Sequence, residues 1–433
     1  MNQLLHFLPL IKVLASFACM LAGIRMKLGI GLSILLGSVV LALLFAMPVG
    51  GFAAAAGHAL LLDKAQYLAV ILGLITVMSR IMESTGQTQR LLESLAGRIR
   101  SPRLRLVLFP ALIGLLPMPG GAVFSAPLVK SAAEGMDILP LQLTSINYWF
   151  RHVWEMSWPL YPGIILASSL SGIPIGRLML LLLPGVCMTL LLGWVFLLRP
   201  GVLPLGEELP MAAGNAQDAK KSAGGNPFWL GLPFLIGIGG AVGLEALLLV
   251  AWPELPFELG MSVALFASAV AAALQNKGGW RIALQVLAGR KLWSMILLIA
   301  AIFIYQQTLK EAGAVQQMAD MSGAGALMAS ALLLPFVVGL VSGISIAYVG
   351  ASFPLLIGVL SQLGLGHQLE AYIVLGSFAG FSGVMISPIH ICFMLTCQYF
   401  GTDLGTSWRK IAPMCLILAG SGIPWFFYLL SGS

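Results

Sequence analysis

Charged side chains are scarce in this chain of 433 residues. Lys, Arg, Asp and Glu together make up 9% of it, whereas an average soluble domain carries about 25%. Long polar stretches are also rare, and the longest, roughly residues 199–226, has the composition of a loop. Hydrophobic residues account for 59% of the chain and recur in runs of about twenty, the length that crosses a ~30 Å hydrocarbon core. These features exclude a large soluble domain and predict an all-α membrane protein.

Cysteine is rare as well. The five cysteines lie in or beside apolar runs without the spacing of metal ligands, which favours a packing role over a disulfide framework. The formal net charge of +7 does not indicate nucleic-acid binding, because the basic residues are spread among short loops between apolar runs. We therefore expect no nucleic-acid partner, no cofactor and no metal site.

Ten apolar runs are expected to cross the membrane. They lie at about 3–22, 28–47, 65–82, 142–170, 174–198, 228–250, 257–275, 292–309, 369–397 and 411–431. Two further apolar segments, 104–129 and 325–356, contain interior prolines and glycines, which interrupt helices. In lipid such interruptions persist only where protein or water covers them. We therefore expect both segments to be re-entrant helical hairpins, each entering and leaving on one side.

The basic residues predict the orientation. With the N-terminus outside, 18 of the 23 Lys and Arg residues fall in cytoplasmic loops. Lys64, Arg177 and Lys310 fall outside, while Lys12 and Arg151 lie within spans. This bias is typical of an inner-membrane protein. It predicts a multi-pass protein of a bacterial or archaeal cytoplasmic membrane, with both termini outside.

The two halves of the chain repeat each other. Pro127 matches Pro354 at an offset of 227 residues, and Pro159 matches Pro388 at an offset of 229. Each half holds five expected crossings, an odd number, so the second copy is predicted to be inverted. We predict a first inverted repeat over 1–198 with hairpin 104–129 and broken helix 142–170, a cytoplasmic linker over 199–226, and a second repeat over 227–433 with hairpin 325–356 and broken helix 369–397.

Inverted repeats with interrupted helices are typical of secondary transporters, whose sites lie near the bilayer midplane. Freed N–H groups at a half-helix N-terminus attract anions, and freed carbonyl groups attract cations. The alternative for the hairpin tips is a tight turn with serines packed against neighbouring helices. The expected substrate-binding residues are Gly120, Gly121, Ser125, Asn147, Arg151, Ser345, Gly350, Ser352 and Ser387.

The first broken helix has the densest polar cluster of any span. Asn147, Arg151 and Glu155 follow one another at four-residue spacing, on one face of a helix. An ionised side chain at mid-bilayer costs about 2.5–3.5 kcal/mol and requires a partner or a wet cavity. One interpretation is that Arg151 and Glu155 form a structural ion pair or lie near the cytoplasmic end. The other is that Arg151 binds a substrate carboxylate or phosphate while Glu155 or His152 carries a coupling proton. His390, in the second broken helix, is either a further ion-coupling residue or a packed neutral histidine.

The segments PMPGGAVFSAP (117–127) and NYWFRHVWEMSWPLYPG (147–163) resemble an uncharacterised membrane family, domain of unknown function 401. Over nearly the whole chain, the architecture resembles the ion transporter superfamily of dicarboxylate, citrate, gluconate and arsenite carriers. That resemblance implies hairpins from opposite faces, a site between their tips and the broken helices, a homodimer built on scaffold helices, and elevator-type movement. Sodium–dicarboxylate carriers of that superfamily have Ser-Asn-Thr signatures at the hairpin tips, and neither tip here contains asparagine.

The sequence favours an ion-coupled secondary transporter of a small anionic organic solute, embedded in membrane lipid, with a proton or sodium as the coupling ion. One alternative is a cation/proton antiporter in which Glu155 and His152 exchange ions without an organic substrate. Another is a membrane enzyme or lipid-handling protein, for which the His152/Glu155 pair is the only motivation. Since no nucleophile accompanies that pair, we expect no catalytic residues.

Overall fold

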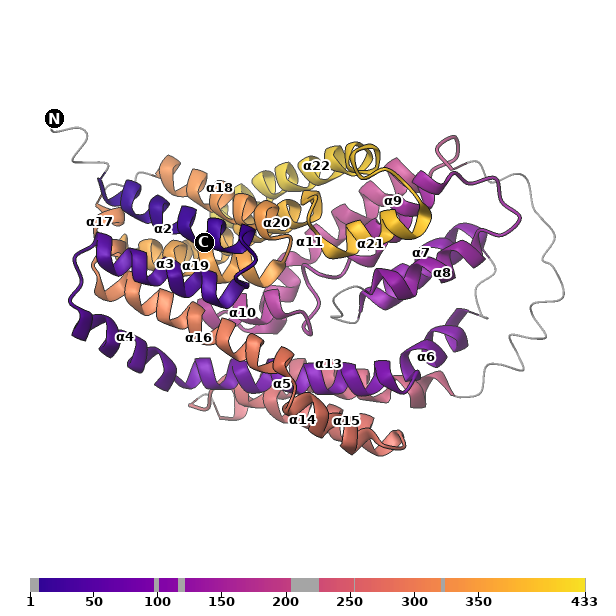
Figure 1. Cartoon of the computed structure of the whole chain (residues 1–433), viewed down its shortest axis with the longest axis horizontal. Helices are drawn as coiled ribbons and strands as arrows, with labels where there is room; N and C mark the ends of the chain where they lie inside the picture. Colours follow the sequence, from indigo (N-terminus) through magenta and orange to yellow (C-terminus); the bar gives the residue numbers. More distant parts are fainter. Residues whose placement is uncertain are drawn as a thin grey trace.

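The computed structural model describes residues 8–96, 101–115, 121–203, 226–252, 254–320 and 324–432, and every regular element in these ranges is helical (Figure 1). The predicted all-α class is thus confirmed. The first half of the chain contains α2 (Leu8–Arg25), α3 (Ile30–Leu44), α4 (Val49–Leu61), α5 (Asp63–Ser84), α6 (Gln87–Ala96), α7 (Pro102–Gly114), α8 (Ala122–Ala132), α9 (Pro140–Arg151), α10 (Pro162–Ser171), α11 (Ile175–Gly193) and the π-helix η1 (Trp194–Leu198).

The second half begins after the predicted linker, most of which (204–225) lies outside the described residues. It contains α13 (Pro227–Ala251), α14 (Phe257–Gln275), α15 (Gly279–Leu287), α16 (Arg290–Glu311), α17 (Ala314–Ala319), α18 (Ala324–Ser342), α19 (Ser345–Gln362), the 3-10 helix η2 (Gly366–Gln368), α20 (Leu369–Ile386), α21 (Ile391–Phe400) and α22 (Leu404–Ser431).

Ten helical segments in the described ranges are long and apolar enough to cross a membrane, so the chain is a multi-pass membrane protein. The number equals the ten crossings expected, but the members differ. Segment 28–47 forms the shorter α3, and 142–170 divides into α9 and α10. In contrast, α18 and α19 each have the length and composition of a span, although 325–356 was expected to be too interrupted. Pro335 and Pro354 lie inside these two helices without ending them.

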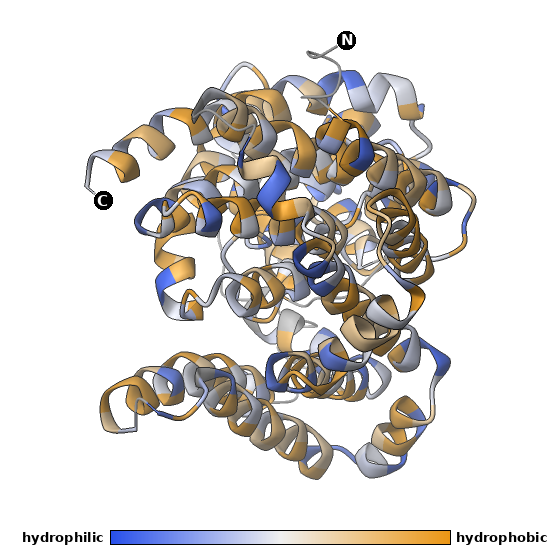
Figure 2. Ribbon diagram, turned by 90° about the vertical axis from the view of Figure 1, so that its left-hand side faces the viewer, coloured by the Kyte–Doolittle hydropathy of each residue, from blue (hydrophilic) through white to orange (hydrophobic). Residues whose placement is uncertain are grey.

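The helices form two groups that differ in size. Along the lower side of Figure 1, α14 packs against α5 and α13, α15 packs on α5, and α6 packs on α13. In the larger group, α18 and α22 both pack on α20, and α3 packs on α2 and α16. Helix α16 also contacts α5, so it joins the two groups. Hydrophobic residues predominate along the helices of both groups, as expected for surfaces that face lipid (Figure 2).

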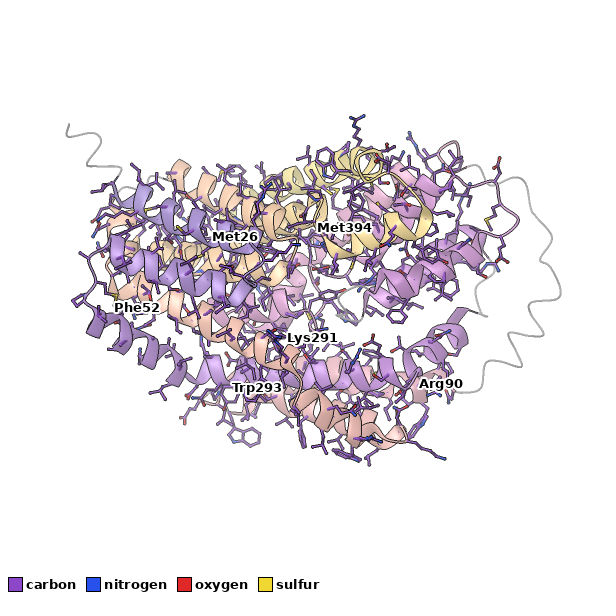
Figure 3. All side chains as sticks on the ribbon, viewed as in Figure 1. Met26, Phe52, Arg90, Lys291, Trp293 and Met394 are labelled. Atoms are coloured by element: carbon purple, nitrogen blue, oxygen red, sulfur yellow. The ribbon has the colours of Figure 1, made fainter. Side chains whose placement is uncertain are left out.

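The two expected hairpins occupy opposite ends of the long axis. Helices α7 and α8 pack together at one end, and α18 and α19 pack together towards the other (Figure 1). In Figure 3, Arg90 of α6 lies at the far end from Phe52 of α4, and Lys291 of α16 lies between them.

A buried carboxylate joins the two halves of the chain. Glu245 of α13 is only 2% exposed. Its Oε1 accepts a hydrogen bond from the Ile175 N–H at 2.7 Å, and its Oε2 accepts one from the Gly176 N–H at 3.2 Å. The two N–H groups belong to the first residues of α11, where backbone N–H groups have no partner within the helix. A carboxylate at this end also interacts favourably with the helix dipole.

We predict that Glu245→Ala destabilises the protein by about 1–3 kcal/mol, because two N–H groups at the start of α11 lose their acceptor. The matched control is Glu254→Ala, since Glu254 lies in the following loop with its side chain exposed. Thermal unfolding of both purified variants in detergent measures the difference. Equal unfolding midpoints for the two variants would contradict this role of Glu245.

Candidate functional site

Interruptions in four helical segments face one another inside the protein. They are the turn at Gly121 before α8, residues 152–161 between α9 and α10, Gly343 and Ile344 between α18 and α19, and residues 387–390 between α20 and α21. The predicted interruptions near Pro159 and Pro388 are thus confirmed. Each hairpin packs against the broken helix of the other half, because α8 contacts α21 and α19 contacts α10.

The guanidinium of Arg151 lies at the centre of this arrangement. Arg151 is the last residue of α9 and only 2% exposed. A Cβ added to Gly121 would lie 2.5 Å from Arg151 Nη2 and 2.7 Å from Nε, so the guanidinium rests directly on the backbone before α8. A Cβ on Gly114, at the end of α7, would overlap the Arg151 carbonyl oxygen. Glycine at both positions therefore permits the first hairpin to close over Arg151.

Tyr161 connects Arg151 to the first hairpin. Its hydroxyl donates a hydrogen bond to the Gly114 carbonyl oxygen at 2.6 Å. The hydroxyl oxygen of Tyr161 in turn accepts a hydrogen bond from Arg151 Nη1 at 3.4 Å. Because Tyr161 immediately precedes Pro162, which occupies the first position of α10 and favours a helix start there, the position of its ring is fixed by the restart of this helix. Tyr161 thus holds the tip of α7 and the guanidinium together.

Glu155 contacts the second hairpin. Its half-buried carboxylate accepts a hydrogen bond through Oε1 from the hydroxyl of Ser345, the first residue of α19. Glu155 therefore meets the second hairpin through a hydroxyl group, and ion pairs lie elsewhere, between Arg80 and Glu83 and between Arg177 and Glu370.

Two histidines connect the broken helices. His152 directly follows α9, and His390 directly precedes α21. Their Nε2 atoms lie 3.1 Å apart, and both rings are buried. His152 Nδ1 lies 2.7 Å from the carbonyl oxygen of Tyr148, so it carries the proton and donates to that oxygen. The hydroxyl of Tyr148 in turn donates to the Met385 carbonyl oxygen at 2.8 Å, which adds a second link between the two helices.

Further polar atoms near the interruptions have unused hydrogen-bonding capacity. The amide nitrogen of Asn147 donates to Thr396 Oγ1 at 3.2 Å. Its Oδ1, and the Oγ of Ser387, are buried and have no hydrogen-bond partner among the described residues. The turn at Gly343, between α18 and α19, packs closely against Ser387, since a Cβ added to Gly343 would lie 3.2 Å from the Ser387 hydroxyl. Buried polar atoms without a partner are uncommon, and a bound solute is one way to satisfy them.

The remaining expected binding residues lie elsewhere or make local bonds. Gly120 lies outside the described residues. The Ser125 hydroxyl donates within its own helix, to Ala122 O at 3.3 Å. Gly350 packs against Ile302 of α16, and the Ser352 hydroxyl donates to the Tyr348 carbonyl oxygen at 2.5 Å, both further along α19. Of the three residues expected to bind at the second tip, the structure thus brings Ser345 to the cluster, whereas Gly350 and Ser352 lie further along α19.

Sequence reasoning missed Tyr148, Tyr161, Thr396 and Cys392. Tyr161 lies in the same polar stretch as Arg151, and Thr396 lies in the broken helix that was expected. Cys392, His152 and His390 are buried, and their ligand atoms all lie within 4.8 Å of one another. The cysteine was assigned to packing because all five cysteines lie in or beside apolar runs without the spacing of metal ligands. Its second neighbour, His152, is 240 residues away in sequence.

The described structure is that of a multi-pass membrane protein with a buried polar centre at interrupted helices. The chain matches the family of proteins of unknown function DUF401 over residues 9–205 and 246–428 and belongs to that family. The resemblance seen in 117–127 and 147–163 is therefore confirmed at the family level. A search of curated proteins finds no match.

The turn between α18 and α19 packs against His390 in the second broken helix, and a substitution at Gly343 tests this packing. Its φ of 65° disfavours a side chain, and an added Cβ would lie 3.1 Å from both the N and the Cα of His390. Gly364 is the matched control, because its φ is 69° and nothing lies within 4 Å of its added Cβ. We predict that Gly343→Ala destabilises the protein by about 1–3 kcal/mol more than Gly364→Ala, the usual cost of overpacking. Thermal unfolding in detergent measures this difference, and equal losses would show that the turn is not packed as described.

Proposed function

We propose that this protein is an ion-coupled secondary transporter of a small organic anion, with its binding site between the two hairpins and the two broken helices. The observation that carries the proposal is the convergence of these interruptions, from both halves of the chain, on Arg151 and Glu155. Transporters of this kind place their sites where discontinuous helices meet near the midplane. A buried guanidinium in a membrane is expensive and therefore rare, and such residues mark substrate or ion pathways.

The architecture we propose is a pair of inverted repeats, and helix packing supports it. Helix α3 packs on α16 just as α14 packs on α5, and α2 packs on α17 just as α13 packs on α6. The hairpin contacts α8–α21 and α19–α10 form a further matched pair, as do α9–α22 and α20–α11. Exchanging the two halves reproduces each of these contacts.

Backbone conformation supports the same repeat. Gly86 and Gly313, which are 227 residues apart, have φ values of 70° and 71°. Gly172 and Gly401, which are 229 residues apart, end α10 and α21 with φ values of 72° and 67°. Both of these helices have ten residues. The offsets equal those of the matched prolines, so the repeat extends from residue type to local geometry.

The charges at the centre favour an anion. Four helices begin there (α8, α10, α19 and α21), and four end there (α7, α9, α18 and α20). Their partial charges largely offset one another, because each N-terminus is matched by a C-terminus. Arg151 therefore makes the part of the site next to the first hairpin positive, directly before the positive end of α8, while the carboxylate of Glu155 lies at the second hairpin. A carboxylate or phosphate suits the planar, forked guanidinium.

Glu155 and the two histidines are the groups we assign to ion coupling. Glu155 binds the second hairpin through Ser345, so its protonation changes a contact that holds that hairpin. The His152–His390 pair shares one hydrogen bond between two nitrogen atoms, which requires a proton on one of them. A proton or a sodium ion at these groups would thereby influence how the halves pack. We further propose elevator-type movement and a homodimer in the cytoplasmic membrane.

We predict that Arg151→Gln abolishes anion uptake, and that Arg151→Lys weakens anion binding by about tenfold or more, since lysine keeps the charge but loses the bidentate geometry. The assay is uptake into proteoliposomes of a panel of radiolabelled carboxylates and phosphates, with and without proton and sodium gradients. The matched control is Arg177→Gln, which removes the exposed pair with Glu370 and should retain uptake. Thermal unfolding verifies that each variant is folded. Absence of gradient-dependent uptake for every anion with the unmodified protein would refute the proposal.

We predict that both ends of each hairpin lie on one side of the membrane. In a variant without the native cysteines, single cysteines replace Leu104 or Glu134 for the first hairpin and Gly325 or Gln362 for the second, all of them exposed. A membrane-impermeant maleimide applied to inside-out and right-side-out vesicles should label Leu104→Cys and Glu134→Cys from the cytoplasm, and the other two from outside. Labelling of Leu104→Cys and Glu134→Cys from different sides would eliminate the re-entrant topology.

A further inference from the structure

We propose that His152, His390 and Cys392 form a binding site for a soft d10 metal ion, for which Cu(I) fits best. The three side chains are buried, and each offers one ligand atom. The atoms come from both halves of the chain, since His152 follows α9 while His390 and Cys392 open α21. This site uses the two histidines assigned above to ion coupling, and its test does not depend on the anion site around Arg151.

The local hydrogen bonding already orients one ligand. His152 Nδ1 donates to the Tyr148 carbonyl oxygen at 2.7 Å, which leaves the lone pair on Nε2 directed towards His390. A carbonyl acceptor for the second ring nitrogen is the usual arrangement around a metal-bound histidine. The His152 and His390 rings are nearly perpendicular, with an interplanar angle of 81°, so the edges and not the faces of the rings can approach an ion.

The three ligand atoms must move slightly to reach metal-binding distances. Metal–nitrogen bonds of ~2.0–2.1 Å in a trigonal site separate the two nitrogen atoms by about 3.5 Å, and the Nε2 atoms here are 3.1 Å apart. All three ligand atoms lie within 4.8 Å of one another. A shift of about 1 Å in the Cys392 side chain, with a slight parting of the rings, would complete the site. His390 and Cys392 lie at a helix start, where rotamer changes leave the rest of the helix in place.

The donor set and the charge select the metal class. Thiolate and imidazole ligands favour soft d10 ions such as Cu(I) and Zn(II) over Mg²⁺ or Ca²⁺. Zn(II) sites are usually tetrahedral, whereas this cluster of described residues supplies three ligands. One Cu(I) with one thiolate is neutral, while Zn(II) with one thiolate adds a positive charge beside the guanidinium of Arg151, the neighbour of His152 in sequence. Both considerations favour Cu(I).

The test is metal binding by the purified full-length chain in detergent. Anaerobic titration with Cu(I) against a chromophoric Cu(I) chelator should give one equivalent bound with thiolate-to-metal absorption in the ultraviolet. Cys392→Ser and His390→Asn should each lower the affinity by about 100-fold or more, since even indirect partners of metal ligands contribute about 10–100-fold. The matched controls are Cys397→Ser and Cys415→Ser, which alter buried cysteines outside the cluster and should retain binding.

Three measurements distinguish a misfolded variant, the absence of a metal site and a preference for another ion. Thermal unfolding without metal identifies any variant that fails to fold, and the two ligand variants provide independent readouts. Failure to bind one equivalent of Cu(I), or binding that survives Cys392→Ser, would overturn the site. A parallel titration with Zn(II) tests the choice of ion, and tighter binding of Zn(II) than of Cu(I) would overturn the assignment to Cu(I).

Discussion

Backbone N–H and C=O groups that leave a helix inside a bilayer have no water to bind, and this constraint governs the structure. The chain interrupts its helices at four places and brings those places together, so that the groups from one interruption meet groups from another. Tyr161 donates to the Gly114 carbonyl oxygen, and Tyr148 donates to that of Met385. Each bond satisfies a carbonyl near the end of one helix with a side chain from another. The polar centre is therefore a consequence of the broken helices and not an addition to them.

Glycine makes this convergence sterically possible. Gly114 and Gly121 admit Arg151 between the helices of the first hairpin, and Gly343 and Gly383 allow similarly close approaches in the second half. A Cβ at Gly383 would overlap the carbonyl oxygen of Phe336 in α18. Interhelical contacts of this kind are the main source of helix association in lipid, where no hydrophobic force operates between helices. The same residues thus supply packing energy and access to the backbone.

Much of the fold follows from hydropathy, because each span must pair its backbone N–H and C=O groups within its own helix and present apolar side chains to lipid. The ten long apolar segments reflect that requirement. The expectation that interior prolines interrupt helices was less reliable, because Pro335 and Pro354 lie within helices that continue past them. For the site, the spacing of Arg151 and Glu155 suggested one helical face. Helix α9 ends at Arg151, so the helical periodicity no longer applies at Glu155, which contacts Ser345 instead. Contacts such as that between His152 and His390 depend on how the two halves pack together, and no local sequence pattern indicates that packing.

The two halves of the chain also differ in how their helices pack. Helix α19 packs against α16 and α17, while the related pairs, α8 with α5 and α6, are not among the packed helix pairs of the described residues. Gly350 makes this docking close, because its missing Cβ leaves room for Ile302. Under the proposed elevator movement, the alternative state would exchange these contacts, with α8 docked on α5. The close approach at Gly350 stabilises the docking of α19 on α16, so the proposed movement would have to break this contact, and a bound solute or coupling ion that favours the alternative state would offset that cost.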